Sequence, residues 1–331
     1  MRSMRRLGAI AVAMALPLTM TACGSSDDAK DGEVVGTVER GPEKEVRASD
    51  DGLRVVALGW SDGEIALDLG VKPIAIYDWQ GHGEENKGVG PWATDAFGDT
   101  EPEVIENTGT TYNYEQIELL EPDVILNVRA SADEEVFDRL SEIAPVASAP
   151  ADTGDFAVDW RTQTEIIGQA IGKDDEAAAA IDETDAVIAD LAAEHPEFVG
   201  KTFVYGAKFA DAYSAYLEGD ARFDVFASLG FVANPPVADL EAMGFFASVP
   251  AEKVSALDAD VALLTTIGMP LSDLQNDPLI SSLGVVKDQR ALVLDETDEI
   301  VLGLGAGTPQ SIALAVEKAV PLLADAAAKV G

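Results

Sequence analysis

The chain has 331 residues, a formal net charge of −38, 47% hydrophobic residues and 25% charged residues. This composition is typical of a globular protein with a substantial core, and the length suits one large domain or two of ordinary size. So acidic a surface repels nucleic acid and anionic lipid, and we expect neither to be a partner.

The first 22 residues have the layout of an export signal. Three arginines precede an uncharged apolar run at residues 7–20, and small residues follow it. The run is shorter than the roughly 20 apolar residues that a transmembrane helix needs. We therefore predict that residues 1–22 are a signal peptide.

Cys23 is the only cysteine of the chain and stands at the predicted cleavage point. This arrangement resembles the lipobox of bacterial lipoproteins, in which the cysteine sulfur takes a diacylglyceryl group and becomes the mature N-terminus, although Met20 stands where leucine is most common. The alternatives are an ordinary signal peptide with a chance cysteine, or a buried thiol. Because no later apolar stretch could span a bilayer, a lipid on Cys23 would be the only membrane attachment.

The segment after Cys23 is small, polar and aperiodic up to residue 36. We therefore expect residues 23–36 to form a lipid-anchored flexible tether. Residues 37–47 place a Gly-Pro pair between two alternating stretches, which indicates a small hairpin. A regular succession of strands and helices starts at residue 53.

Residues 53–149 alternate between strand and helix patterns. Ser61 precedes a helix that ends at Gly70, and Glu64 lies at the spacing of a capping box. The glycine-rich segment 78–113 is predicted to be mostly loop. The predicted strands are 54–58, 73–77, 123–128 and 145–149, and the other predicted helices are 114–120 and 133–143.

The pattern changes at residues 159–193, which are predicted to be helical with one break. The first piece ends at Gly172, Asp174 or Asp175 caps the second, and His195-Pro196 closes it. Strands are then predicted at 202–205, 260–264 and 291–294, and helices at 221–229, 251–257 and 309–323. Strands that alternate with helices predict largely parallel sheets covered on both faces.

An internal repeat relates two distant parts of the chain. Residues 115–126 (EQIELLEPDVIL) align with residues 252–263 (EKVSALDADVAL) at an offset of 137, and each copy reads as a short helix, a tight turn and a buried strand. Helix-to-strand packing explains the apolar matches, but not the pairing of Glu115 with Glu252. An acid near a helix N-terminus contributes about 0.3–1 kcal/mol, which explains either glutamate alone.

These patterns predict an α/β fold of two pseudo-symmetric lobes with mostly parallel sheets. A long linker helix would join the lobes, and a ligand would bind in the cleft between them, at the carboxyl ends of the strands. The predicted boundaries are 37–158 for the N-terminal lobe, 159–195 for the linker and 196–331 for the C-terminal lobe.

Several stretches, taken in their order and spacing, carry a resemblance to a known family. They are RVVALGWSDGEIALDLGVKPIAI (54–76), NYEQIELLEPDVIL (113–126), LSEIAPV (140–146), the helix from Trp160, SVPAEKVSALDADVALL (248–264) and LISSLGVVKDQRALVLD (279–295). The chain resembles the substrate-binding lipoproteins of iron–siderophore and cobalamin ABC importers, whose lobes are joined by one rigid helix. The resemblance covers nearly all of residues 53–325 and is greatest to the iron–siderophore branch of high-GC Gram-positive bacteria.

The resemblance implies a monomeric binding protein that is held by its lipid at the extracytoplasmic face of the cell membrane, with no catalytic activity and no resident cofactor. The ligand would be an iron(III)–siderophore complex, and the partner would be an ABC importer permease dimer with its ATPase subunits. In this family one glutamate on each lobe meets an arginine pocket of the permease, and the matching motif N-x-E-x-I-x-x-L-x-P-D and its second-lobe counterpart place these on Glu115 and Glu252. Two carboxylates at a fixed separation suit two arginine sites by bidentate pairing.

The family lines its cleft with aromatic side chains, which bury the apolar body of a siderophore, and a few basic ones, which donate to the oxygens that hold the iron. The matching candidates at the ends of predicted elements are Trp60, Trp79, Gln80, Arg129, Lys208, Tyr213, Tyr216, Arg222, Phe245 and Phe246. The alternative is a solvated charge or surface salt bridge for each cation, and core packing for each aromatic residue. Trp92 could either line the cleft or pack in the core.

The acidic surface favours a neutral or cationic ligand. We therefore expect a ferric hydroxamate or mixed-ligand siderophore rather than a triply charged catecholate complex. Haem and cobalamin remain alternative ligands. Direct capture of zinc or manganese would need several converging histidines, and the chain has only His82 and His195.

An enzyme is the other class considered. A secreted α/β hydrolase would need a G-x-S-x-G elbow and a histidine partner, and the sequence has no such elbow. The glycine-rich stretch GLGAGT at 303–308 lacks the lysine of a phosphate-binding loop. The sequence therefore favours a binding protein.

Overall fold

The computed structural model describes residues 32–106, 109 and 111–331, and Asp31–Gly331 form one compact unit. The predicted signal peptide, Cys23 and the first part of the predicted tether lie outside the described residues. Its last part is instead strand β1 (Glu33–Thr37), which pairs antiparallel with β2 (Glu45–Ala48). The expected hairpin therefore begins earlier, because β1 packs on helix α4 (Trp160–Ile171).

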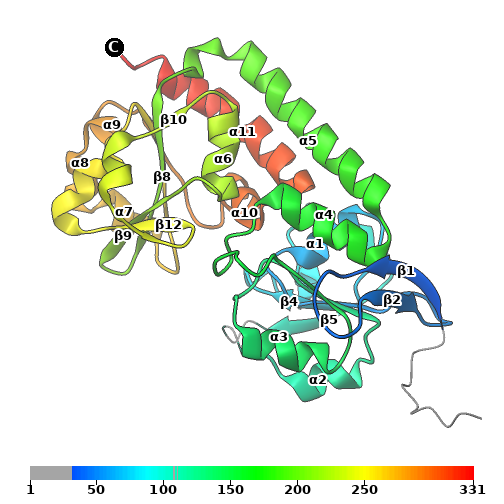
Figure 1. The fold of residues 1–331 in the computed structure, drawn as a ribbon. Helices are drawn as coiled ribbons and strands as arrows, with labels where there is room; N and C mark the ends of the chain where they lie inside the picture. Colours follow the sequence, from blue (N-terminus) through cyan, green and yellow to red (C-terminus); the bar gives the residue numbers. More distant parts are fainter. Residues whose placement is uncertain (1–31, 107–108, 110) are drawn as a thin grey trace, which may run out of the picture. The chain divides into compact units, whose positions relative to one another are not determined.

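The N-terminal lobe is built on five parallel strands in the order β5-β4-β3-β6-β7 (Figure 1). The strands are β3 (Val55–Ala57), β4 (Ala75–Asp78), β5 (Glu103–Glu106), β6 (Val124–Asn127) and β7 (Val146–Ser148). The strand order reverses between β3 and β6, and in open α/β sheets ligands bind in the crevice beyond the carboxyl ends of the strands at such a point. Strand β5 lies in the segment that was expected to be mostly loop.

Helices cover both faces of this sheet because successive residues of a strand point to opposite sides. Val55 shares a core with α1 (Asp62–Asp68) and α4. Val56 shares the other core with α2 (Tyr114–Leu119) and α3 (Glu134–Ser141). The chain between β4 and β5 adds two short 3-10 helices, η1 (Glu84–Asn86) and η2 (Thr94–Phe97).

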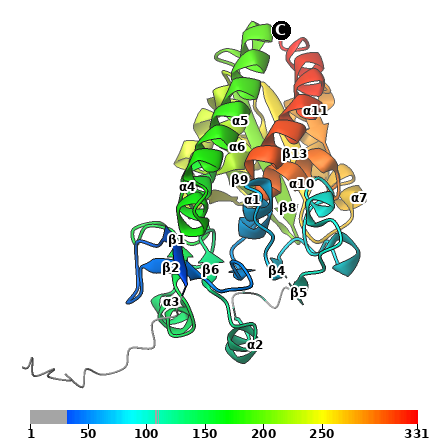
Figure 2. The same cartoon turned by 90° about the vertical axis from the view of Figure 1, so that its right-hand side faces the viewer.

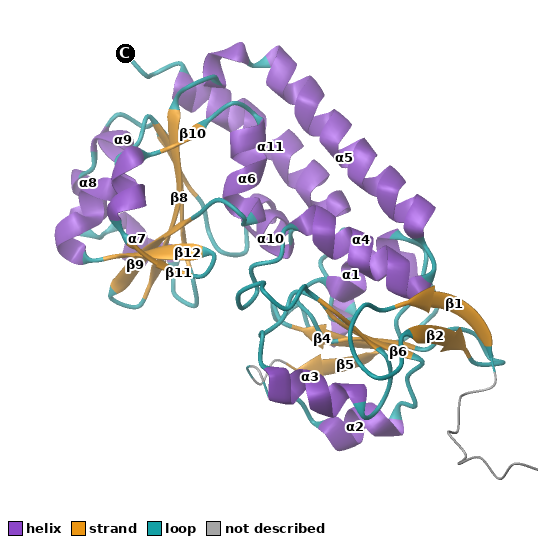
Figure 3. Ribbon diagram, viewed as in Figure 1, coloured by secondary structure: helices purple, strands orange, loops and turns teal. Residues whose placement is uncertain are grey.

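The C-terminal lobe has a seven-stranded sheet in the order β11-β12-β9-β8-β13-β14, with β10 paired to β8 (Figure 3). The strands are β8 (Thr202–Phe209), β9 (Ala212–Tyr216), β10 (Val232–Ala233), β11 (Glu241–Met243), β12 (Phe246–Val249), β13 (Val261–Thr266) and β14 (Ala291–Val293). Strands β8, β10, β13 and β14 are parallel, whereas β9, β12 and β11 form antiparallel pairs. The sequence predicted β8, β13 and β14 but missed the antiparallel strands.

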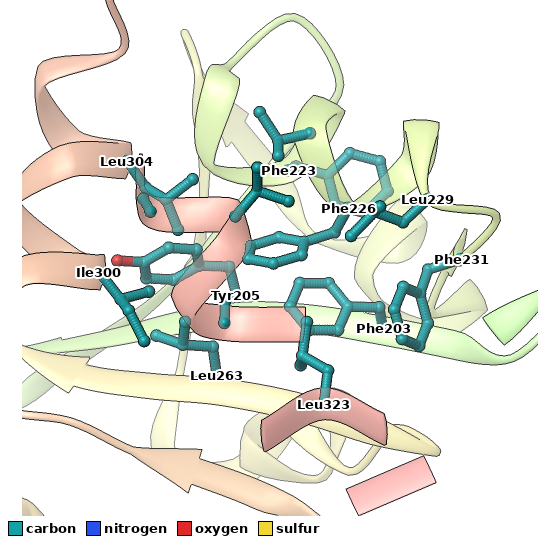
Figure 4. Packing of buried hydrophobic residues seen from close by; sticks show 14 of the residues in the cluster. Phe203, Tyr205, Phe223, Phe226, Leu229, Phe231, Leu263, Ile300, Leu304 and Leu323 are labelled. Carbon is teal, nitrogen blue, oxygen red and sulfur yellow. The ribbon is translucent and has the colours of Figure 1, made fainter. Parts of the chain in front are cut away.

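One face of this sheet packs against helices through an aromatic core (Figure 4). Phe203 and Tyr205 of β8 lie beside Phe226, and the ring centroids of Phe203 and Phe226 are 4.5 Å apart. The helices on this side are α6 (Ala221–Ser228), α10 (Glu299–Ala306) and α11 (Pro309–Ala327), of which α10 was not predicted. The other face carries η5 (Ala251–Leu257), α7 (Leu271–Gln275), α8 (Pro278–Ser282) and α9 (Gly284–Lys287).

The predicted linker consists of α4 followed by α5 (Asp174–Glu194), with the expected break at Gly172. Gly172 has a left-handed backbone with φ 68°, a conformation that suits glycine at a helix end. The expected cap at Asp174 or Asp175 is wrong, because Lys173 occupies the cap position and no side chain bonds there. Helix α4 packs on the N-terminal lobe and α5 packs along α11 (Figure 2). No helix among the described residues is long and apolar enough to cross a membrane.

Two other local predictions differ from the structure. The capping box at Ser61 and Glu64 is wrong, because Ser61 has a left-handed backbone with φ 62° and its Oγ accepts a hydrogen bond from Trp79 Nε1. Glu64 is buried, and its Oε2 accepts from Trp92 Nε1 at 2.6 Å. Residues 251–257 form the 3-10 helix η5 instead of an α-helix.

The internal repeat has a structural basis in the two central strand pairs. Asp123 precedes β6, and its Oδ2 accepts from the backbone N–H of Arg54, just before the neighbouring strand β3. Asp260 precedes β13, and its Oδ2 accepts from the N–H of Thr202, the first residue of the neighbouring strand β8. Each aspartate therefore fixes the start of a central strand, and the same hydrogen bond from the backbone to an aspartate occurs in both lobes.

Candidate ligand-binding site

A cavity of about 620 Å³ lies between the two lobes. The N-terminal lobe contributes residues that follow β3 and β4, and the C-terminal lobe contributes the β8–β9 hairpin, β12, the end of β13 and helix α10. Eight of the ten residues expected to bind a ligand line this cavity: Trp60, Trp79, Gln80, Tyr213, Tyr216, Arg222, Phe245 and Phe246. The carboxyl ends of parallel strands from both lobes thus meet at one space, as expected for this fold class.

Two stacked tryptophans form the wall on the side of the N-terminal lobe. The rings of Trp60 and Trp79 are nearly parallel, with centroids 4.4 Å apart and an angle of 7° between their planes. Phe156 stacks on Trp60 at 4.1 Å but does not itself line the cavity. Trp60 and Trp79 thus present an aromatic wall to the cavity, and Phe156 supports Trp60 from outside the lining.

Two residues with unfavourable backbones hold this stack in place. Ser61 and Phe156 have positive φ values of 62° and 54°, which non-glycine residues rarely adopt. Ser61 accepts the hydrogen bond from the indole of Trp79, and Phe156 donates its backbone N–H to Ala130 O at 2.9 Å. Sequence reasoning missed the role of Phe156, because nothing in its neighbourhood predicts where its ring points.

The wall on the side of the C-terminal lobe is also aromatic. Tyr216 and Phe245 stack with centroids 6.3 Å apart and an angle of 10° between their planes, and Phe246 packs edge-on against Phe245. These residues come from the antiparallel part of the sheet and from the turn before β12. The strands that the sequence did not predict therefore carry this wall.

Arg222 is the one cation that lines the cavity within the described part of the chain. Its guanidinium lies 3.8 Å from the Tyr216 ring centroid and donates through Nε and Nη2 to the two carboxylate oxygens of Asp220, at 2.7 and 2.6 Å. Burial alone would lower the pKa of Arg222, but Asp220 raises that pKa above its usual value. Arg222 is therefore fully charged and held in one orientation.

Arg129, expected at the cleft, does not line it. Its side chain is buried beneath Trp60 and Trp79, where Nη1 donates to the carbonyl oxygens of Gly305 and Ala306 at 3.0 and 3.1 Å. Burial lowers the pKa of Arg129 to about 10, so it stays charged at neutral pH. Because Arg129 follows β6 and those carbonyls end α10, this cation joins the two lobes behind the cavity.

Lys208, the other expected cation, also lies outside the cavity lining. Its ammonium donates to Asp277 Oδ2, which also accepts from the Tyr213 hydroxyl at 2.6 Å. Burial alone would raise the pKa of Asp277, but these hydrogen bonds lower it to about 2. Lys208 thus has an internal partner in the C-terminal lobe, which a position at a strand end does not reveal.

Gln80, His82 and Trp92 of the N-terminal lobe differ in their position relative to the cavity. Gln80 lines the cavity and donates through Nε2 to Leu302 O at 3.3 Å, a second direct bond between the lobes. His82 lies beside it, with Nε2 3.2 Å from Gln80 Oε1. Trp92 lies away from the cavity lining and packs on the core beside Glu64.

A polar wall was not expected from the sequence. It consists of Thr265 and Thr266 at the end of β13 and of Glu296 and Thr297 after β14. The run VALLTT, in which an apolar strand ends in two hydroxyl residues, was the signal that could have indicated it. Among the described residues no group of three or more His, Cys, Asp or Glu side chains is arranged to hold a metal.

Glu115 and Glu252 lie at equivalent places in the two lobes. Glu115 is in the first turn of α2, which precedes β6, and Glu252 is in the first turn of η5, which precedes β13. Both side chains are exposed, and neither forms an ion pair with another described residue. Both carboxylates are thus accessible.

The lobes, the helical linker and the cavity between them define a two-lobed solute-binding protein. The family model for periplasmic binding proteins matches residues 55–297. The chain belongs to the periplasmic binding protein family, and this confirms the expected class, which consists of binding proteins and not of enzymes. No curated protein is similar enough in sequence to count as a match.

Solved structures support the same assignment. A periplasmic solute binding protein from Mycobacterium smegmatis is 25% identical, with a TM-score of 0.75, and the match covers 88% of this chain and 99% of that one. PiaA from Streptococcus pneumoniae, in complex with ferrichrome, is 25% identical, with a TM-score of 0.70 and coverage of 87% and 97%. SirA from Staphylococcus aureus, complexed with staphyloferrin B, is 22% identical, with a TM-score of 0.67 and coverage of 87% and 98%. These likenesses confirm the predicted fold and family.

Proposed function

We propose that this protein captures a ferric siderophore, of the hydroxamate or mixed-ligand type, and delivers it to the permease of an ABC importer for iron uptake. The observation that carries the proposal is the aromatic cavity. A space of about 620 Å³ between walls of tryptophan, tyrosine and phenylalanine suits a bulky ligand with an apolar exterior. Proteins of similar structure bind siderophores, since PiaA is known in complex with ferrichrome and SirA complexed with staphyloferrin B.

Charge supports the choice of ligand type. Three hydroxamate groups neutralise iron(III), whereas three catecholate groups leave the complex triply negative, and the chain carries a net charge of −38. Within the described residues, no hydrogen bond engages Nη1 of Arg222, so this nitrogen is free to donate to an oxygen that holds the iron. One such donor suits a neutral complex better than a trianion.

Delivery would use the two exposed carboxylates and the lipid. Glu115 and Glu252 would each enter an arginine pocket of one permease subunit, with bidentate geometry that a lysine could not match. A lipid on Cys23 would keep the protein at the extracytoplasmic face of the membrane that contains the permease. The protein would consist of an N-terminal lobe at residues 37–158, a linker at 159–195 and a C-terminal lobe at 196–331.

The experiment is ligand titration of the purified protein, monitored by tryptophan fluorescence and calorimetry. Ferrichrome, a ferric mixed-ligand siderophore, a ferric catecholate, the iron-free forms, haem and cobalamin would be compared. Two of the four tryptophans line the cavity, so a ferric complex that binds there should quench strongly. Saturable binding of a ferric hydroxamate or mixed-ligand complex is expected. Binding of haem or cobalamin alone would identify that compound as the ligand instead of a siderophore. No response to any ferric complex would refute the proposed function.

A further inference from the structure

The polar wall of the cavity contains a carboxylate whose charge has no cationic partner among the described residues. Glu296 follows β14, and its Oε2 accepts one hydrogen bond, from the backbone N–H of Gly268. No described residue donates to its Oε1. A partly buried carboxylate with one free oxygen is a strong acceptor for a ligand cation.

The rest of the cavity does not neutralise this charge. Among the described residues the lining contains one cation, Arg222, and this guanidinium already donates to both oxygens of Asp220. Arg129 lies behind the lining and donates to backbone carbonyls of α10. The lining therefore presents two groups of opposite charge, the Arg222 guanidinium and the Glu296 carboxylate.

A second, independent observation comes from Thr266. The residue is 1% exposed and lines the cavity, and its Oγ1 has no hydrogen-bond partner among the described residues. The hydroxyls of Thr265 and Thr297, by contrast, bond to Thr266 O and Asp295 Oδ1. A buried hydroxyl without a partner is costly in a folded protein, so it indicates a place where a ligand supplies the missing bond.

These two groups follow neighbouring strands and both line the cavity. Strands β13 and β14 are parallel neighbours, with Leu264 level with Val293, and Leu294 donates its N–H to Leu264 O. Thr266 is the last residue of β13, and Glu296 follows the last residue of β14 by three positions, so both come from the carboxyl ends of these neighbouring strands. The backbone bond from Gly268 to Glu296 then holds the carboxylate beside the end of β13.

We propose, on the basis of the function proposed above, that Glu296 and Thr266 form an ammonium-binding site in the polar wall of the cavity. The protein then selects ferric hydroxamate siderophores that carry a free amine over neutral or anionic ones of the same size. The aromatic walls bury the hydroxamate body, Arg222 donates to its oxygens, and the ammonium donates to Glu296 Oε1 and Thr266 Oγ1. Glu296 is a specificity-determining residue in this arrangement.

The test compares two ligands that differ by one charge. Ferrioxamine B carries a free terminal amine, and its N-acetyl derivative is neutral but keeps the same iron-binding groups. The protein should bind ferrioxamine B about tenfold more tightly than the acetylated complex, as measured by fluorescence quenching and calorimetry. Glu296→Gln should bring the two affinities within about twofold of each other, by weakening only the charged ligand.

A matched variant separates local recognition from overall charge. Asp211 is an exposed acid in the β8–β9 turn and does not line the cavity, so Asp211→Asn removes the same charge nearby and should leave the preference intact. Thr266→Val, which keeps the shape of the side chain, should weaken ferrioxamine B binding several-fold and leave acetyl-ferrioxamine binding nearly unchanged. Glu296→Asp, a smaller change, should reduce the preference without abolishing it.

The outcomes are distinguishable. Equal affinity of the unmodified protein for the two complexes would overturn the inference about Glu296 but leave the proposed function standing. A preference that survives in Glu296→Gln, or that disappears in Asp211→Asn, would also overturn it. Failure to bind either complex, or any other ferric siderophore, would count against the proposed function itself.

Discussion

The two lobes share a scaffold but differ where they face the cavity. In each, an aspartate before one central strand bonds to the backbone at the start of the next, as Asp123 and Asp260 do. At the opposite, carboxyl ends of the strands the likeness is lost. The N-terminal lobe presents stacked tryptophans, whereas the C-terminal lobe adds antiparallel strands that carry tyrosine and phenylalanine. Residues that build the sheet are thus repeated, and residues that meet the ligand are not.

Buried acids show a second difference between the lobes. In the N-terminal lobe, burial raises the pKa of Asp62 to about 6 and that of Glu64 to about 7. In the C-terminal lobe, burial alone would raise the pKa of Asp220 and Asp277, but bonded cations lower both. The N-terminal lobe therefore holds two buried acids with raised pKa values, and the C-terminal lobe holds buried acids that are paired with cations.

The largest effect on import should come from the two exposed glutamates, Glu115 and Glu252, which lie at equivalent places in the two lobes. Reversing both charges, with Glu115→Lys and Glu252→Lys, should abolish import of radiolabelled ferric siderophore into cells, because two lysines would face two arginine pockets. Ligand affinity of the purified double variant should stay the same. Asp190→Lys with Glu194→Lys, on the exposed face of α5, changes the net charge equally and should leave import intact. Undiminished uptake by the first pair would refute the docking role.

The next largest effect is on ligand affinity, to which we expect the two aromatic walls to contribute unequally. Trp60→Ala removes a ring that stacks on both Trp79 and Phe156, so we expect affinity for the ferric siderophore to fall about 30-fold or more. Phe245→Ala removes a half-buried ring at the other wall and should cost about fivefold. Calorimetry would measure both, with circular dichroism as the control for folding. A larger loss for Phe245→Ala would reverse this ranking.

The two cations outside the lining allow a sharper comparison. Arg129→Met leaves two carbonyls of α10 without their donor, so we expect the free energy of unfolding to fall by about 3 kcal/mol and ligand affinity to fall with it. Lys208→Met disrupts a bond within one lobe and should lower stability by about 2 kcal/mol with ligand affinity unchanged. Chemical denaturation and calorimetry would give both values. Unchanged affinity in Arg129→Met would exclude a role for the bond between lobes in binding.

The smallest effect is the pH dependence of the N-terminal lobe. The folded pKa of Glu64, about 7, lies above its ordinary value of 4.5, so the folded state binds more protons between these pH values and stability falls as pH rises through them. Glu64→Gln keeps an acceptor for Trp92 and removes this loss. The variant should gain about 3 kcal/mol over the unmodified protein above pH 7 and almost nothing below pH 4.5.

Denaturant titrations at pH 4.5, 6 and 8 would measure this difference. Asp277→Asn tests the opposite pH dependence in the C-terminal lobe. Because the folded pKa of Asp277 lies below its ordinary value, its contribution is present above pH 3.8 and is lost as pH falls toward 2. A Glu64→Gln difference that does not vary with pH would show that Trp92 packing, not the buried charge, sets the stability there.

Sequence patterns predicted the shared scaffold well and the cavity only in part. Buried apolar strands and the offset of 137 residues identified both lobes, the linker and the exposed pair Glu115 and Glu252. Trp60 and Trp79 could be placed at the cavity because each follows a strand that was recognised. Arg129 also follows such a strand, but the carbonyls that draw it inward lie 176 and 177 residues away along the chain.

The C-terminal wall was harder to predict for a physical reason. Strand β9 (AYSAY) is short and contains alanine and serine, so its sequence carries little of the β-branched signal of a strand. Its conformation depends on pairing with β8 and β12, which are contacts between segments. Phe156 depends likewise on tertiary packing, because its left-handed backbone is not encoded by neighbouring residues.

The tryptophan stack gives the protein a built-in optical probe. Two indoles 4.4 Å apart and nearly parallel are close enough for their electronic transitions to couple, so the protein should show an exciton couplet in its circular dichroism spectrum. The sign and size of that couplet depend on the angle between the rings. A ligand that lies flat on the stack would leave the couplet intact, whereas one that separates the indoles would erase it. The spectrum would therefore report binding geometry without any added label.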